Sequence, residues 1–238
     1  MNKFISLAIL SIFIVAPLSA QTDTSSVIWY FDRVDSIGGY AATPLIQLPV
    51  IIETPLGKSA LFDGINAGIL LNCNPIGSAT KFTIEVIFRP DSSELSGDKS
   101  QPRFFHLKNT DNSRRITMET RILPNQQWSF DTFIKSEISN LTQLDSLQTH
   151  TSGTWHHAAI VYSDSLMRQY VDGALQLSGK VIYLPIDTVP KISIGVRQDL
   201  RYWFKGAIRM IKVSKRVLNP SEFTLPQITS VKDIHRRP

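Results

Sequence analysis

Apolar and polar residues alternate with a period of two through most of this chain. In residues 82–88 the apolar side chains of Phe82, Ile84, Val86 and Phe88 share one face of an extended segment. Helical periodicity is nearly absent, and turn-forming residues recur at short intervals, which predicts an all-β sandwich or barrel. The predicted strands are residues 27–31, 59–62, 69–71, 82–88, 115–122, 128–135, 155–162, 167–171, 174–177, 191–197 and 202–213.

Two β-hairpins are predicted in the second half of the chain. The first joins residues 115–122 to residues 128–135 through the turn-rich connector Leu-Pro-Asn-Gln-Gln. The second joins residues 155–162 to residues 167–171, after which Asp-Gly at 172–173 leads into another strand. Asp-Gly between alternating segments is among the strongest short-range hairpin signals. The polar loop of residues 90–102 is the longest break between strands and is expected at a sheet edge or a site rim.

The register of the first hairpin decides which charged residues meet. Symmetric pairing about Asn125 would place Glu119 opposite Asp131, with Arg121 on the diagonal. A shift by two residues would instead place Arg121 directly opposite Asp131. In either register two carboxylates and a guanidinium share one face of the sheet.

These charged residues form the candidate site. A carboxylate accepts hydrogen bonds and a guanidinium donates them, which suits the hydroxyl groups of a sugar. Trp203 could serve as a stacking platform for a sugar ring. The predicted ligand-binding residues are Glu119, Arg121, Asp131, His150, Arg197 and Trp203. The competing interpretation is a solvated cross-strand ion network, worth about 0.2–1 kcal/mol per pair.

The beginning of the chain has the pattern of a secretory signal peptide. Lys3 precedes an apolar segment at residues 4–15, and small residues follow up to Ala20. The segment is too short for a membrane span, which needs about 20 apolar residues. We therefore expect residues 1–20 to be removed on export to the periplasm or the exterior. Residues 21–225 are expected to form one all-β sandwich domain, and residues 226–238 a flexible basic tail.

The net charge of the chain narrows the class of its binding partner. The chain has 25 Lys and Arg against 20 Asp and Glu, a modest excess that favours acidic partners such as uronate or sulfated glycans. The basic residues are scattered, so no nucleic-acid partner is expected.

Cys73 is the only cysteine, so an internal disulfide cannot form and stability must come from the core.

Metal and nucleophile motifs are missing from the sequence. His156 and His157 are adjacent on a predicted strand, so one side chain faces inward and the other outward. Each is expected to be a hydrogen-bonded structural histidine, because diverging side chains cannot share a metal ion. The chain also contains neither a Gly-x-Ser-x-Gly elbow nor a phosphate loop.

An ordered set of short motifs resembles the laminin-G-like jelly rolls of the concanavalin A-like lectin/glucanase superfamily. The motifs are Leu-Phe-Asp-Gly at 61–64, Phe-Thr-Ile-Glu at 82–85, Trp-His-His-Ala-Ala at 155–159, Tyr-Val-Asp-Gly at 170–173, Ile-Gly at 194–195, Phe-Lys-Gly-Ala-Ile at 204–208 and Val-Leu-Asn-Pro-Ser-Glu-Phe at 217–223. The resemblance implies a concanavalin A-like, two-sheet antiparallel jelly-roll sandwich. It also implies glycan or protein binding on a concave sheet face or a loop rim.

The chain departs from the family pattern where the family often carries acidic residues. Ile65 and Asn66 follow Phe-Asp-Gly, and Arg209 stands where many members have aspartate. The resemblance therefore leaves a structural calcium ion open, with Asp63 or loop carbonyls as ligands, and implies no other cofactor. The glucanase motif Glu-x-Asp-x-x-Glu is absent.

These observations favour an exported, non-catalytic module that binds carbohydrate through its concave sheet face. One alternative is a glycoside hydrolase or polysaccharide lyase that uses Glu119 and Asp131 as paired carboxylates. Arg121 between them is expected to keep both ionised and so leave no general acid. The other alternative is a structural or adhesive component that contacts a cell-surface protein.

Overall fold

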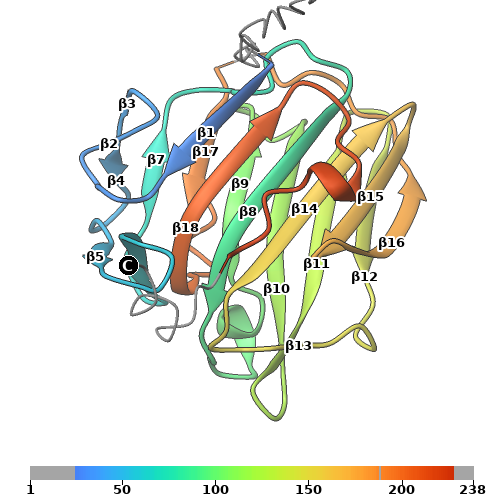
Figure 1. Ribbon diagram of the computed structural model, residues 1–238. Helices are drawn as coiled ribbons and strands as arrows, with labels where there is room; N and C mark the ends of the chain where they lie inside the picture. The colour runs from blue at the N-terminus through green and yellow to red at the C-terminus, as the bar shows by residue number, and fades with distance from the viewer. Residues whose placement is uncertain (1–24, 188, 228–238) are drawn as a thin grey trace, which may run out of the picture.

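Two large antiparallel β-sheets pack face to face in the computed structural model, which describes residues 25–187 and 189–227 (Figure 1). The helical segments of this described part are the short 3-10 helices η1 (Gly97–Ser100) and η2 (Pro220–Glu222), and none is long and apolar enough to cross a membrane. The predicted all-β, two-sheet jelly-roll sandwich is confirmed. The predicted signal peptide lies outside the described residues, as does most of the predicted tail.

The sheet nearer the viewer in Figure 1 is called the front sheet. Its strands follow the order β16-β15-β14-β8-β18-β6-β5, and β1 also pairs with β18. In chain order they are β1 (Ser26–Tyr30), β5 (Val50–Ile52), β6 (Ser59–Asp63), β8 (Phe82–Pro90), β14 (His156–Ser163), β15 (Leu166–Val171), β16 (Ala174–Lys180) and β18 (Lys205–Ser214).

The second sheet, called the back sheet, follows the order β12-β11-β10-β9-β17-β7-β4, and β13 pairs with β11. Its strands are β4 (Thr43–Pro44), β7 (Ile69–Leu71), β9 (Arg103–Lys108), β10 (Arg115–Leu123), β11 (Gln127–Lys135), β12 (Asn140–Leu144), β13 (His150–Thr151) and β17 (Lys191–Ile194). The strands β2 (Ser36–Ile37) and β3 (Tyr40–Ala41) form a separate pair. Sequence analysis did not predict β9, because two adjacent phenylalanines interrupt its alternation, or the polar edge strand β12.

Both predicted hairpins are present, and the first adopts the symmetric one of its two possible registers. Residues Glu119 and Asp131 are direct partners in the β10–β11 pair, whose pairing is symmetric about Asn125. The β14–β15 hairpin is followed by a tight turn in which Asp172 and Gly173 have φ values of 51° and 81°. Positive φ at both central residues is the geometry that the Asp-Gly signal predicts.

Aromatic side chains from both sheets interlock in the core. Phe88 of β8 stacks on Phe104 of β9 with ring centroids 4.5 Å apart, and it meets the edge of Trp128 of β11 at 5.3 Å. Phe204 closes the cluster against both phenylalanines. Cys73 is buried, and burial raises the pKa of its thiol to about 12, so a nucleophilic thiolate is disfavoured at neutral pH.

The outer face of the front sheet is covered by the segment that follows β18. This segment crosses in front of β8 and β14 (Figure 1), and its Leu218 and Phe223 pack with Ala159 of β14 and other apolar residues. Buried Glu85 of β8 accepts hydrogen bonds from the backbone amide of Thr224 at 2.7 Å and from His157 at 3.1 Å. Polar residues on the outer face of the front sheet therefore hold the segment that follows β18 in place.

Replacement of Phe88 by alanine should lower the free energy of unfolding by about 3–5 kcal/mol, because it opens a cavity between the sheets. Denaturant titration of the purified protein measures the loss. Leu175→Ala is the matched control, since Leu175 is exposed on edge strand β16 and should shift stability by no more than about 0.5 kcal/mol. Equal losses in the two variants would contradict the assignment of Phe88 to the core.

Candidate functional site

The outer face of the back sheet carries the charged residues of the first hairpin. On β10, Met118 and its alternate neighbours point into the core. Thr117, Glu119 and Arg121 lie at the intervening positions and therefore point outward. Asp131 points the same way because it is the direct cross-strand partner of Glu119.

A bulge in the β9–β10 pair adds a further arginine to this face. Met118 pairs with Phe105, but the next residue, Glu119, pairs with Arg103, so Phe104 is an extra residue in β9. Phe104 and Phe105 are both buried in the core. Arg103 is thereby turned outward, and its Nε atom lies 2.5 Å from Oε2 of Glu119.

The carboxyl groups of Glu119 and Asp131 are more deeply buried than the guanidinium groups with which they pair. Arg121 donates a hydrogen bond from Nε to Oδ2 of Asp131 at 2.7 Å, and its Nη2 lies 3.9 Å from Oε1 of Glu119. The side chains of Asp131 and Glu119 are 0% and 5% exposed, against 13% for Arg103 and 26% for Arg121. A ligand on this face would therefore meet guanidiniums first, and the carboxyls act as positioning residues.

Burial changes the charge of the carboxyl pair. It raises the pKa of Glu119 to about 7, Asp131 adds to the rise, and Arg103 and Arg121 oppose it. Burial also raises the pKa of Asp131, against the opposing effect of Arg121. Contrary to the expectation that Arg121 keeps both carboxylates ionised, desolvation outweighs the nearby positive charge and raises the pKa of both groups.

Besides Phe133, which pairs with Thr117 and has its ring centre 4.6 Å from the guanidinium carbon of Arg115, this face carries the aromatic side chain of Tyr202. The guanidinium carbon of Arg103 lies 4.1 Å from the centre of its ring, and Arg201 and Arg197 approach the same ring at 4.9 and 5.8 Å. The backbone of Tyr202 has a φ of 61°, an uncommon left-handed conformation for a bulky residue. Sequence analysis missed Tyr202, and the only signal for it was its position beside Trp203.

Trp203 is joined to Arg103 by a parallel β-bridge, and its side chain packs against Gly68. Its ring lies so close to Gly68 that a β-carbon there would be 3.1 Å from ring atom Cζ3, and its indole nitrogen donates to the carbonyl of Leu200 at 3.0 Å. Of the other predicted site residues, Arg197 approaches the face through Tyr202 and lies 3.4 Å from Asp199.

His150 lies apart from the carboxyl pair. It pairs with Trp128 across β13 and β11, and the two rings are tilted against each other with centroids 4.8 Å apart. Trp128 belongs to the core, so this contact is on the opposite side of the back sheet from Glu119. The structure thus brings together Glu119, Arg121 and Asp131, adds Arg197 through Tyr202, and separates His150.

The adjacent histidines point to opposite sides of β14, as predicted. His157 faces outward to Glu85, whereas the Nδ1 atom of His156 lies 2.7 Å from Oδ2 of Asp172. The order Thr154, His156, Asp172 resembles a catalytic relay, with Thr154 Oγ1 2.8 Å from His156 Nε2. The same Nε2 atom also lies 2.9 Å from the carbonyl of Thr151, to which it can only donate. A nitrogen that donates there cannot accept the threonine proton, so the arrangement is structural.

Asp63 does not fit a calcium ligand. Its Oδ1 atom accepts hydrogen bonds from the backbone amides of Ile65, Asn66 and Ala67, and its Oδ2 atom accepts one from Gln47. Burial would raise the pKa of Asp63, but these amides outweigh it and lower the pKa. Within residues 25–187 and 189–227, no cluster of three or more His, Cys, Asp and Glu residues could hold a metal ion.

The sequence of this chain matches the profile of a known protein family. The profile described as the concanavalin A-like lectin/glucanases superfamily matches residues 63–223. This range includes every predicted site residue and most of both sheets. None of the curated proteins compared with the chain matches it.

Solved structures with the same architecture include carbohydrate-active and toxin domains. Domain 4 of AbnA, an extracellular GH43 arabinanase from Geobacillus stearothermophilus in complex with arabinotriose, has a TM-score of 0.60 and 16% identity, over 82% of this chain and 94% of that one. The binding domain of botulinum neurotoxin serotype D has a TM-score of 0.58 and 14% identity, over 83% of this chain and 50% of that one. The binding domain of botulinum neurotoxin DC in complex with SialylT has a TM-score of 0.53 and 12% identity, over 84% and 50%. At these identities the likeness establishes the fold.

The His156–Asp172 pair predicts a pH-dependent contribution to stability. Burial lowers the pKa of His156, but hydrogen bonds to Asp172 and Thr151 outweigh it and raise the pKa overall. A raised folded pKa means that the stabilisation is complete below the unfolded value of about 6.5 and is lost as pH rises through the folded value.

Asp172→Asn should therefore destabilise the protein more at about pH 5.5 than at about pH 9. Asparagine tolerates the positive φ at this position, so the turn is retained. The difference should be about 1 kcal/mol or less, because Asp172 is half-exposed. Denaturant unfolding at both pH values measures it, and an equal loss at the two would contradict a charged pair.

Proposed function

Because the chain belongs to the concanavalin A-like lectin/glucanase superfamily, we propose that it is an exported, non-catalytic module that binds carbohydrate through the outer face of its back sheet. The observation that carries this proposal is the pair of guanidiniums, Arg103 and Arg121, that stand on the buried carboxyls of Glu119 and Asp131. Export rests on the signal-peptide pattern of residues 1–20, with the periplasm or the exterior as the destination.

Fixed guanidiniums are well suited to sugar recognition. Each carboxyl holds its arginine in place before any ligand arrives, which lowers the entropy cost of binding. The donors that remain can reach hydroxyl oxygens in a defined geometry. The ring of Tyr202 lies against Arg103 and helps to fix that guanidinium in place.

Related architectures support a carbohydrate ligand by analogy. The arabinanase domain was solved with arabinotriose and a toxin binding domain with SialylT. A shared fold hosts many functions, so the residues of this chain must carry the proposal.

A glycoside hydrolase or polysaccharide lyase is the second candidate. The raised pKa of Glu119 favours it, since a general acid must hold its proton at working pH. Catalysis also requires both carboxyls to touch the scissile bond, and Glu119 and Asp131 are almost fully buried beneath arginines. Burial therefore favours binding over hydrolysis.

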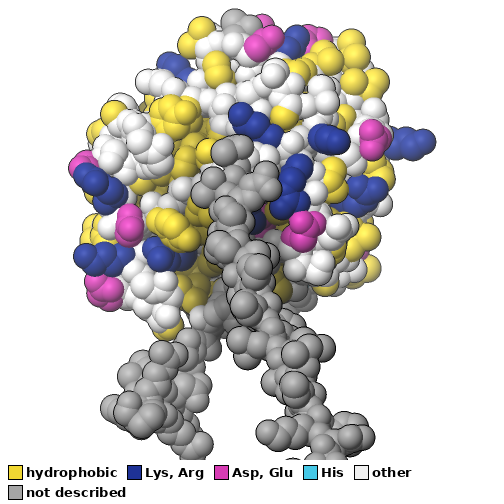
Figure 2. All heavy atoms as spheres, turned by 45° about the horizontal axis from the view of Figure 1, so that its top comes forward, with side chains coloured by type: hydrophobic (Ala, Val, Ile, Leu, Met, Phe, Trp, Pro, Cys, Tyr) yellow, Lys and Arg dark blue, Asp and Glu magenta, His cyan; other side chains and the backbone are white. Residues whose placement is uncertain are grey.

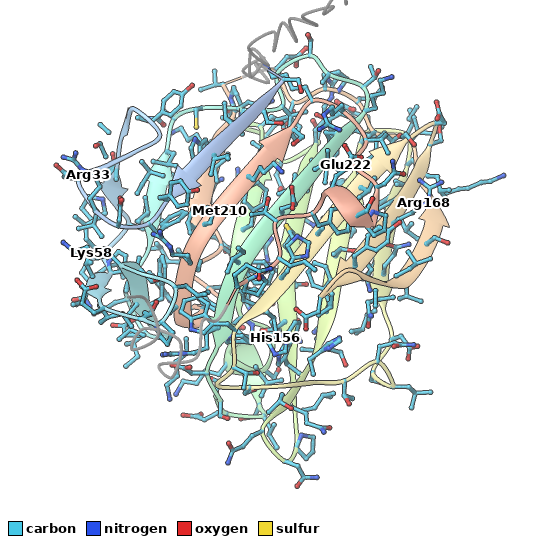
Figure 3. All side chains as sticks on the ribbon, in the orientation of Figure 1. Arg33, Lys58, His156, Arg168, Met210 and Glu222 are labelled. Atoms are coloured by element: carbon cyan, nitrogen blue, oxygen red, sulfur yellow. The ribbon has the colours of Figure 1, made fainter. Side chains whose placement is uncertain are left out.

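Glycan-array binding of residues 21–238 with the Arg121→Gln variant tests the proposal. Loss of a charge-assisted hydrogen-bonding group should weaken glycan binding about tenfold or more. The matched control is Arg168→Gln, which removes the same charge from β15 on the other sheet (Figure 3). Addition of calcium in a parallel array shows whether binding needs the ion.

The outcomes separate the candidate functions. Binding that Arg121→Gln weakens and Arg168→Gln retains is the expected result. Release of shortened products from the bound glycan would favour the enzyme instead. Silence across a broad array, with and without calcium, would contradict carbohydrate binding and favour a protein partner.

A further inference from the structure

A row of four basic residues crosses the same face of the back sheet. Lys135 of β11 pairs directly with Arg115 of β10, Arg115 pairs with Lys108 of β9, and Lys108 pairs with Lys191 of β17. Direct cross-strand partners point to the same side of a sheet. Arg115 stands two and four residues before Thr117 and Glu119, so this basic row shares the outer face with the candidate site.

The basic row is electrostatically costly as it stands. Like charges placed directly opposite each other destabilise a sheet. The hydrogen bonds that its members make go to uncharged oxygens of the β9–β10 connector: Lys108 to the carbonyls of Asn109 and Thr110, Arg115 to Oδ1 of Asn112, and Lys135 to the carbonyl of Asn112. No carboxylate of the described chain lies within ion-pair distance of any of the four. By contrast, the face in Figure 2 shows Lys and Arg side chains dispersed among hydrophobic and acidic ones.

Buried hydrogen-bond donors next to the row also lack acceptors. His106 of β9 is 1% exposed, and its Nδ1 atom accepts from the backbone amide of Gln198 at 3.3 Å, so the hydrogen of the neutral ring is on Nε2. Burial, followed by Arg115 and Arg103, holds the pKa of His106 well below its usual value and keeps the ring neutral.

Neither Nε2 of His106 nor Nε of Arg115 has a hydrogen-bond partner among the described residues, and the same holds for Nη1 of Arg103. A buried donor without an acceptor is costly, so each calls for an explanation. All three nitrogens are buried, so an anion on the face would neutralise the row above them without accepting their hydrogen bonds.

The length of the row favours an extended ligand over a single ion. Four adjacent strands are separated by three spacings of about 4.8 Å, so the row is roughly 14 Å long. At the Lys108–Lys191 end it opens into a hollow of about 240 Å³ that is also lined by Gln198. A chain that carries several negative groups could cross the strands and meet each basic residue in turn.

We infer that the basic row binds a linear acidic glycan whose carboxylate or sulfate groups lie along Lys135, Arg115, Lys108 and Lys191. The inference rests on the proposed carbohydrate function and adds the charge of the ligand and its direction across β11, β10, β9 and β17. Arg103 and Arg121 on the same face then bind hydroxyl groups of the sugar units. A sugar is favoured over a nucleic acid because guanidiniums cover the rings of both Tyr202 and Phe133, so neither ring is a free platform for a base.

The test compares two charge-matched double variants by titration calorimetry. Lys108→Gln/Lys191→Gln removes two charges from the row, and Arg168→Gln/Lys180→Gln removes two from the front sheet. The probes are an oligogalacturonate, a heparin oligosaccharide, a neutral oligosaccharide of equal length and single-stranded DNA. We expect at least one acidic glycan to bind, with a loss of about tenfold or more in the row variant and none in the control.

Salt and thermal stability give independent readouts. Affinity for the acidic glycan should fall between about 0.1 M and about 1 M salt, because screening shortens the range of the row's field. The ligand-free row variant should melt no earlier than the wild type, since it loses repelling charges. The carboxylate and sulfate probes show which group the row prefers.

Three results would overturn the inference: equal affinity for neutral and acidic glycans, unchanged affinity in the row variant, or equal binding of single-stranded DNA. A neutral glycan that binds and is lost in Arg121→Gln would leave the proposed function standing while the inference fails. Failure of every glycan to bind would remove both.

Discussion

Contact between the two sheets is the constraint on which the rest of this molecule depends. With one cysteine in the chain, the apolar layer that contains Phe88, Phe104 and Trp128 must hold the sandwich together. Every second residue of each strand is committed to that layer, so the intervening residues are left for the outside. The charge pattern of the outer face is thus fixed by which residues the core takes, and a change of register by one would exchange the two faces.

The two outer faces are used differently. On the front sheet, buried Glu85 binds His157 and the segment after β18, and its pKa is lowered because these hydrogen bonds and Lys212 outweigh burial. On the back sheet, burial prevails and the pKa of Glu119 rises. Buried ion pairs contribute little net stability once desolvation is included. The back-sheet carboxyls are therefore better explained by the orientation that they give to Arg103 and Arg121.

Sequence patterns predicted the parts that local rules control. The short connector around Asn125 and the apolar alternation on both sides determine the register that places Glu119 opposite Asp131. The tight turn at Asp172 and Gly173 was likewise predicted from the Asp-Gly pair, and the positive φ of both residues agrees with it. Arg103 and Tyr202 were missed because the first reaches the face through a bulge and the second through a positive φ, and both depend on tertiary packing. His150 was placed at the site because it follows the hairpin in sequence. In the structure it lies in the short strand β13, pairs with Trp128 and is on the core side of the back sheet.

The bulge at Phe104 lets β9 give two consecutive residues to the core and still direct Arg103 to the outer face. If β9 paired with β10 at its present length without the bulge, Glu119 would lie opposite Phe104 and Arg103 would be directed into the core. Point substitutions can weaken this face gradually, one contact at a time. Deletion of Phe104 would restore regular pairing with Arg103 still opposite Glu119, and its cost would fall on the core, which would lose one aromatic ring.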